Sequence, residues 1–201
     1  MAGYGGAGRE RRIAREDVLR LLRERGGSAS MGEVAEELGD EGLAGEVVGE
    51  LAGEGLVERS GDRVSLTPRG EAEAEEVHRR HVEAERLLVE AGLVGEAEAH
   101  RAAHALEHLP VDLERILAEA RGRRVETLYS LEPGASGRVV AILAAEPRIL
   151  SRLYGVGILP GRPVRLVSKT GSLVVVETGA EARLAALDAG VAKRILVALG
   201  G

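Results

Sequence analysis

The sequence of 201 residues contains no cysteine, phenylalanine or tryptophan, and only three tyrosines. Without cysteine, disulfides, zinc–thiolate sites and iron–sulfur clusters are all excluded, because each of them needs a thiol. The hydrophobic core must instead be built from Leu, Val, Ile and Ala, and a hydrophobic content of 44% is enough for one. No apolar run approaches the roughly 20 residues of a membrane-spanning helix, and the N-terminus lacks the apolar segment of a signal peptide. We therefore expect a cytoplasmic protein with no membrane contact.

Residues 1–75 have the pattern of a winged helix-turn-helix domain. Three short helices are predicted within residues 13–27, 28–39 and 43–58, because apolar residues recur at helical spacing, and glycines end the first two. The next segment alternates apolar and polar residues around Ser60-Gly61-Asp62, which is typical of a β-hairpin. Three helices followed by a hairpin is the order of a winged helix.

The rest of the chain predicts a helical region and then a small β domain. Long helical patterns run to Gly92 and to Pro110, and a shorter one follows. We assign residues 76–122 to a helical metal-binding and dimerisation domain. Residues 123–134 are expected to be a linker, and the Val-rich residues 135–201 a small C-terminal β barrel. The fold class is therefore α+β and multidomain.

The histidines are concentrated in a single region of the sequence. All five lie within about thirty residues: His78, His81, His100, His104 and His108. At about 100° per residue, a helix places His100, His104 and Glu107 on one narrow face, with His108 further round. The preceding helix presents His81 and Glu85 four residues apart, also on one face. Nitrogen and carboxylate ligands of this kind suit divalent Mn, Fe, Ni or Zn.

The histidines have two other interpretations. One is a solvated helix face that carries scattered histidines and binds nothing. The other is an inverted zinc metallopeptidase, because the segment "HALEH" matches the pattern H-x-x-E-H, in which Glu107 would be the general base. A peptidase also needs a third ligand and a substrate cleft, and only a short helix and a small β domain follow. We therefore expect that the protein is not an enzyme.

The segments "RRHVEAERLLVEAGL" and "AHRAAHALEHLPVDLERIL" resemble the two ligand-bearing helices of the diphtheria-toxin-repressor family of metal-dependent transcriptional regulators. The segments "EVAEELG", "LAGEGLVER" and "VSLTPRGEAEA" are similar to its helix-turn-helix and wing, and "LYGVGILPG" to its FeoA-like barrel. The resemblance covers nearly the whole chain and implies a homodimer that binds operator DNA and regulates genes of metal homeostasis.

The resemblance also implies two metal sites. One site would use His81, Glu85 and His100, with Glu146 as the nearest match to a ligand from the barrel. The other site would use Asp17 with His104, Glu107 and His108. The expected metal is Fe(II) or Mn(II); Zn(II) and Ni(II) stay open, because iron-type relatives carry Cys and manganese-type relatives an acid at the position of His104. A metal held by Asp17 would connect the winged helix to the dimer layer, whereas the alternative role for Asp17 is a favourable charge near the start of a helix.

The charge of the helix-turn-helix departs from what DNA binding requires. Residues 26–58 contain no Lys or Arg but nine acidic residues, whereas DNA affinity depends on cations that neutralise phosphates. The arginines available for weak DNA contacts lie in an N-terminal arm and on the wing: Arg9, Arg11, Arg12, Arg15, Arg59 and Arg63. Two hypotheses follow. The protein is a metal-activated DNA-binding regulator, or it is a metal-binding dimer whose acidic winged helix contacts protein.

Overall fold

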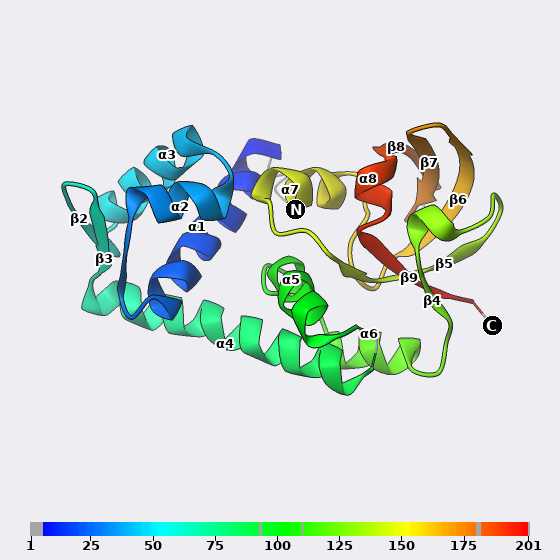
Figure 1. Cartoon of the computed structure of the whole chain (residues 1–201), viewed down its shortest axis with the longest axis horizontal. Helices are drawn as coiled ribbons and strands as arrows, with labels where there is room; N and C mark the ends of the chain where they lie inside the picture. Colours follow the sequence, from blue (N-terminus) through cyan, green and yellow to red (C-terminus); the bar gives the residue numbers. More distant parts are fainter. Residues whose placement is uncertain (1–5, 93, 110, 180–181, 201) are drawn as a thin grey trace. The chain divides into compact units, whose positions relative to one another are not determined.

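The computed structural model describes residues 6–92, 94–109, 111–179 and 182–200. The chain divides into two compact units, and the first comprises Met1–Glu83 with Glu146–Ser151. The second comprises Ala84–Ala145 with Arg152–Gly201. Figure 1 labels the helices and strands of both units. Among the described residues, no helix is both long enough and apolar enough to cross a membrane.

The first unit contains the predicted three helices and hairpin. Its elements, in chain order, are α1 (Gly6–Glu24), β1 (Ser28–Ser30), α2 (Met31–Leu38), α3 (Glu41–Gly53), β2 (Val57–Ser60), β3 (Arg63–Leu66) and the first part of α4 (Pro68–Glu90). The hairpin β2–β3 pairs Ser60 with Arg63 around the predicted turn. A strand that the sequence did not predict, β1, pairs with β3 and gives the antiparallel order β1-β3-β2.

Local capping fixes the ends of the two helices of the helix-turn-helix. The Ser30 hydroxyl accepts a hydrogen bond from the Glu33 backbone N–H, and the Glu33 carboxylate accepts one from the Ser30 N–H, which forms a capping box at the start of α2. Gly39 ends α2 with a left-handed φ of 66°. The Asp40 side chain then accepts from the Leu43 N–H and starts α3. A tight connection between α2 and α3 follows directly from these residues.

The start of α4 packs closely against the chain just before β2. The Thr67 hydroxyl donates to the carbonyl oxygens of Gly55 and Leu56 and accepts from the Gly70 N–H. Gly70 is buried, and a Cβ at this position would lie 1.9 Å from the Leu56 carbonyl oxygen. Glycine is therefore the residue that permits this approach of α4 to the wing.

The second unit combines helices with a six-stranded sheet. Its strands are β4 (Val125–Thr127), β5 (Ser136–Ile142), β6 (Pro163–Thr170), β7 (Leu173–Thr178), β8 (Arg183–Asp188) and β9 (Ile195–Leu199), in the order β4-β9-β5-β6-β7-β8. Its helical elements are the end of α4, α5 (Glu96–Leu106), α6 (Leu113–Ala120), η1 (Leu128–Ser130), the end of α7 (Pro147–Gly155) and α8 (Ala189–Ala192). One apolar core joins Leu88, Leu106 and Leu117 of the helices to Val140 and Leu196 of the sheet.

The prediction of a closed C-terminal barrel is wrong, because the sheet is open. Within the described strands, β4 pairs only with β9 and β8 only with β7. The two edge strands, β4 and β8, therefore do not pair with each other. Closure requires strands long enough to tilt and stagger around an axis, and β4 has three residues. That short strand lies inside the range expected to be a linker, residues 123–134, and adds an edge to the sheet.

Candidate metal centre

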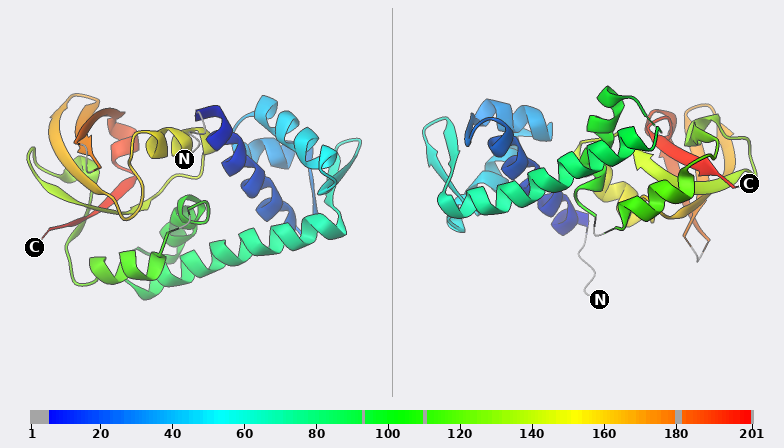
Figure 2. Two further views of the ribbon diagram at one scale, coloured as in Figure 1. Left: turned by 180° about the vertical axis from the view of Figure 1, so that it is seen from behind. Right: turned by 90° about the horizontal axis from the view of Figure 1, so that it is seen from below.

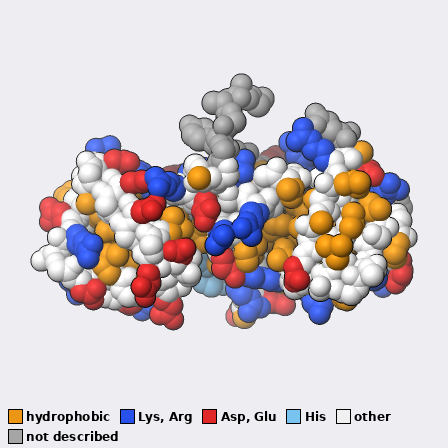
Figure 3. Space-filling model, turned by 90° about the horizontal axis from the view of Figure 1, so that it is seen from above, with side chains coloured by type: hydrophobic (Ala, Val, Ile, Leu, Met, Phe, Trp, Pro, Cys, Tyr) orange, Lys and Arg blue, Asp and Glu red, His pale blue; other side chains and the backbone are white. Residues whose placement is uncertain are grey.

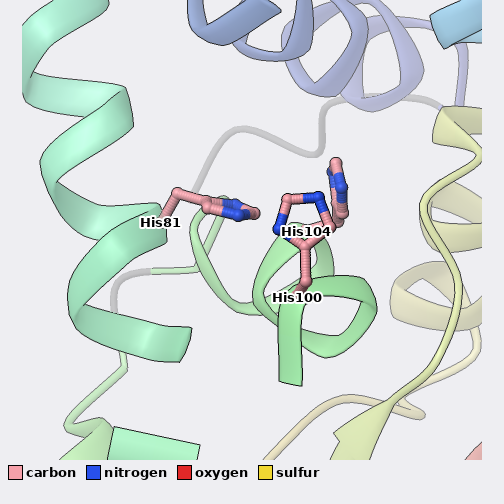
Figure 4. Close-up of side chains that lie close together, drawn as sticks. All are labelled: His81, His100 and His104. Carbon is pink, nitrogen blue, oxygen red and sulfur yellow. The ribbon is translucent and has the colours of Figure 1, made fainter. Parts of the chain in front are cut away.

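Helices α4 and α5 bring three of the predicted ligands together within the second unit. Glu85 Oε2 of α4 lies 3.5 Å from Nδ1 of His100 on α5. The rings of His100 and His104 meet edge to face, with their centroids 5.2 Å apart. Figure 4 shows these two imidazoles on successive turns of α5. One carboxylate and two imidazoles thus form a cluster of the ligand types that divalent transition metals prefer.

His81 is carried by α4, the helix that also carries Glu85. Figure 4 shows its imidazole projecting from that helix, and both views in Figure 2 show α4 as one uninterrupted helix. Residues four apart share one helix face, so His81 and Glu85 leave α4 on the same side. His81 is only 1% exposed. The other histidine of α4, His78, belongs to a separate ion-pair network, with its Nδ1 3.8 Å from Glu24.

Glu107 and His108 form a second, fully buried pair. Glu107 Oε1 lies 3.5 Å from His108 Nε2, and the two residues are 1% and 0% exposed. A buried carboxylate is costly unless it is hydrogen-bonded, paired or bound to a metal. The helix that was predicted to continue to Pro110 ends at Leu106, with Glu107 as its C-cap. His108 therefore lies in the turn that follows α5.

The last turn of α5 is held by a residue that the sequence did not single out. The Tyr154 hydroxyl on α7 donates a hydrogen bond to the backbone carbonyl of Ala105. Tyr154 is buried, and Ala105 directly follows His104. This bond positions the part of α5 that presents the predicted ligands. No local pattern in the sequence indicates this contact, because Tyr154 and Ala105 lie 49 positions apart.

Asp17 lies in the middle of α1 and is 2% exposed. The alternative role of a favourable charge in the first helical turn is wrong, because α1 starts at Gly6 and has no acidic residue in its first turn. Asp17 Oδ1 instead lies 3.9 Å from Nη2 of Arg20, one turn further along the helix. The sequence-based prediction did not include Arg20. The signal that could have indicated it was a cation on the apolar side of α1.

Glu146, the weakest of the predicted ligands, directly precedes α7. Its backbone carbonyl accepts hydrogen bonds from the N–H groups of Ile149 and Leu150 in the first turn of the helix. The residue is half-buried. Its backbone thus has a structural role in starting α7.

The expected basic N-terminal arm is part of a helix. Arg9, Arg11, Arg12 and Arg15 all lie in α1. The Arg11 guanidinium contacts Glu46 and Glu50 of α3 at 2.5 and 2.7 Å, and Arg15 makes two hydrogen bonds to Glu54. The hydrogen bond from Arg15 lowers the pKa of the Glu54 carboxyl. Arg11 and Arg15 therefore neutralise part of the acidic surface of α3.

The two wing arginines remain exposed. Arg59 Nε donates to the Gly61 carbonyl at the hairpin turn, and Arg63 donates to the Ser28 hydroxyl. The exposed positions of α3, in contrast, are Ala52 and a set of glycines and acids such as Gly45 and Glu46. Over the first unit, the face in Figure 3 shows mainly acidic side chains with a few arginines among them. The wing thus offers cations, whereas α3 offers no donor for base recognition.

Two family models match adjoining parts of the chain. Residues 67–124 match the iron dependent repressor, metal binding and dimerisation domain, and residues 126–199 match the FeoA domain. The first match contains six of the predicted ligands: His81, Glu85, His100, His104, Glu107 and His108. Neither description is that of an enzyme, which agrees with the prediction that the chain is not one and leaves the peptidase interpretation without support.

Three solved structures are similar to this chain over part or most of its length. A manganese-dependent transcriptional repressor in complex with manganese is 24% identical, with 92% of this chain and 100% of that chain covered and a TM-score of 0.45. IdeR of T. acidophilum is 20% identical, with 94% and 97% covered and a TM-score of 0.45. An iron uptake regulatory protein, FeoA, is 26% identical over 37% of this chain and 96% of that chain, with a TM-score of 0.33. No curated protein matches the sequence.

Proposed function

We propose that this chain is a metal-dependent transcriptional regulator of metal homeostasis. The premise is that it belongs to the diphtheria-toxin-repressor family of metal-dependent regulators and carries a FeoA domain. The observation that carries the proposal is the cluster of Glu85, His100 and His104 within the matched metal-binding domain. The buried pair Glu107–His108 lies in the same domain and supports it.

We assign the ligands to two sets. The first set consists of His81, Glu85 and His100, with Glu146 as an accessory ligand. The second set consists of Asp17, His104, Glu107 and His108. Both sets mix imidazoles with carboxylates and contain no thiolate, and such ligands suit divalent Mn, Fe, Ni or Zn. Among these metals, the resemblance to iron- and manganese-dependent regulators favours Fe(II) or Mn(II). A bound metal would supply a positive charge that Asp17 and the ligands on α5 can share.

The ion pairs within the first unit explain how metal binding would reach the DNA-binding elements. Asp17 lies on α1, and α1 is joined to α3 by Arg11 with Glu46 and by Arg15 with Glu54. A change in the position of Asp17 therefore moves α3 together with α1. Metal binding would select the conformation of the dimer in which the two winged helices are spaced for an operator.

The same ion pairs bear on how the protein would contact DNA. Because Arg11 and Arg15 are engaged with α3, the exposed wing arginines Arg59 and Arg63 are the better candidates for phosphate or minor-groove contacts. DNA contacts made through the wing arginines predict weak binding that depends on DNA shape. The second hypothesis, a protein partner for the acidic face of α3, is favoured by its exposed glutamates and its lack of base-reading side chains.

Substitution of the wing arginines distinguishes these two hypotheses. We expect the double variant Arg59→Ala, Arg63→Ala to bind the protein's own upstream DNA about tenfold more weakly than the wild type. The slope of the logarithm of the binding constant against the logarithm of the salt concentration should become shallower by the amount that about two phosphate contacts contribute. Fluorescence anisotropy of metal-loaded protein at several salt concentrations measures both quantities. Metal affinity, measured by calorimetry, should not change.

The matched control is the variant Arg121→Ala, Arg123→Ala, which removes two exposed arginines from the second unit. We expect this variant to bind DNA like the wild type. If metal-loaded wild-type protein does not bind DNA even at low salt, the winged helix is a protein-contact module, and the second hypothesis holds.

A further inference from the structure

Arg20 is the largest of the fully buried side chains among the described residues, with an exposure of 1%. It lies on α1, one turn after Asp17. A guanidinium keeps its charge in proteins, and removing it from water is costly unless carboxylates surround it. The residues around Arg20 must therefore compensate a permanent positive charge.

Three carboxylates surround this guanidinium, all within the first unit. Arg20 Nη1 contacts both oxygens of Glu24 at 2.9 Å, and Nη2 donates to Glu37 of α2. Nη2 also lies 3.9 Å from Oδ1 of Asp17. Glu24 and Glu37 are partly exposed, whereas Asp17 is almost as buried as Arg20 itself. Of the three acids, Asp17 is therefore the one whose charge is stabilised least by water.

We propose that Arg20 is a built-in counter-cation for Asp17, which balances the charge of this buried carboxylate and lowers the affinity with which Asp17 takes part in metal binding. The inference rests on the proposed function, because it requires Asp17 to be a metal ligand. Arg20 is then a positioning residue that sets the metal concentration at which the regulator responds.

The physical reason is competition between two cations for one buried carboxylate. Without metal, the guanidinium compensates the charge of Asp17 and, through Glu37, joins α1 to α2. When a divalent cation binds Asp17, the guanidinium remains nearby, because Glu24 holds it with two hydrogen bonds. Like charges at this separation repel, and the repulsion is little screened in a buried site. The metal must therefore bind against a fixed positive charge.

Two variants of the full chain test the proposal by calorimetric titration with Mn(II) and by thermal unfolding in chelator. We expect Arg20→Gln to bind Mn(II) about tenfold more tightly than the wild type and to unfold at a lower temperature in chelator. The conservative control Arg20→Lys keeps the positive charge and should stay within about twofold of the wild-type affinity. A side chain that was merely structural would lower the unfolding temperature without tightening metal binding.

An unchanged or weaker Mn(II) affinity of Arg20→Gln would overturn the proposal. If that variant does not fold in chelator, the double variant Arg20→Gln, Glu24→Gln replaces it, because it removes the cation together with one of its partners and leaves the net charge unchanged. Tighter Mn(II) binding is again expected, and unchanged binding again contradicts the proposal. The variant Asp17→Asn distinguishes a failure of this inference from a failure of the proposed function. If it binds Mn(II) like the wild type, Asp17 is not a ligand, and the second ligand set of the proposed function fails.

Discussion

Replacing His104 and His108 together by alanine is expected to weaken metal binding by about a hundredfold or more while leaving the helices folded. The two imidazoles are half of the proposed second ligand set, and His104 also contacts His100 of the first set. Alanine favours the helical conformation, so α5 should keep its structure. Calorimetric titration with Mn(II) measures the affinity, and circular dichroism in chelator measures the helical content.

A third histidine provides the control for this experiment. His78 lies on α4, and its imidazole faces Glu24 rather than a proposed ligand. We expect His78→Ala to bind Mn(II) with wild-type affinity, so that any loss in the double variant reflects the site and not the number of histidines. An unchanged affinity of the double variant would show that the second ligand set is wrong.

Gly70→Ala should destabilise the first unit by about 3 kcal/mol, at the upper end of the range for overpacked sites. The new methyl group would lie 1.9 Å from the Leu56 carbonyl oxygen, and backbone cannot move aside as a flexible side chain can. To relieve this contact, α4 would have to separate from the segment before β2 and break the hydrogen bonds of Thr67. Urea unfolding, followed by circular dichroism in chelator, measures the loss.

The matched control for this prediction is Gly49→Ala on α3. This glycine is exposed, and a Cβ there would meet no atom within 4 Å. Because alanine is a better helix former than glycine, we expect a gain of up to about 1 kcal/mol. Equal stability of the Gly70→Ala and Gly49→Ala variants would contradict the close packing of α4 against the wing.

The winged helix could be predicted because its signals are local. Ile13, Val18 and Leu22 recur at helical spacing and are all buried, and Gly26 and Gly27 end the pattern with positive φ angles. The strand β1 was missed because it has three residues, and its pairing with β3 joins segments more than thirty residues apart in sequence. No local pattern carries that information.

The C-terminal sheet shows where a strand pattern stops being informative. The Val-rich composition of this part of the chain predicted strands, and β7 is one of them, with buried residues alternating with more exposed ones. The same alternation occurs in a closed barrel and in an open sheet, so it could not decide between them. The open edges follow from pairing, in particular from the short β4 that adds to β9.

The candidate site was only partly predictable for the same reason. The spacing of Glu85, His100 and His104 is a local property of two helices, and the structure brings these residues together. The end of α5 before His108 depends on a cap that the helical spacing did not reveal. The pairing of Arg11 with Glu46 depends on tertiary structure, since these residues lie 35 positions apart.

The most direct test of metal-dependent regulation is fluorescence anisotropy of labelled upstream DNA, titrated with the protein in chelator and again in Mn(II) or anaerobic Fe(II). We expect binding only in the metal-loaded samples, weaker as the salt concentration rises, and none for the His104→Ala, His108→Ala variant at the same metal concentration. Equal binding with metal and with chelator, or no binding by protein shown to hold metal, would contradict the proposal that metal activates this protein for DNA.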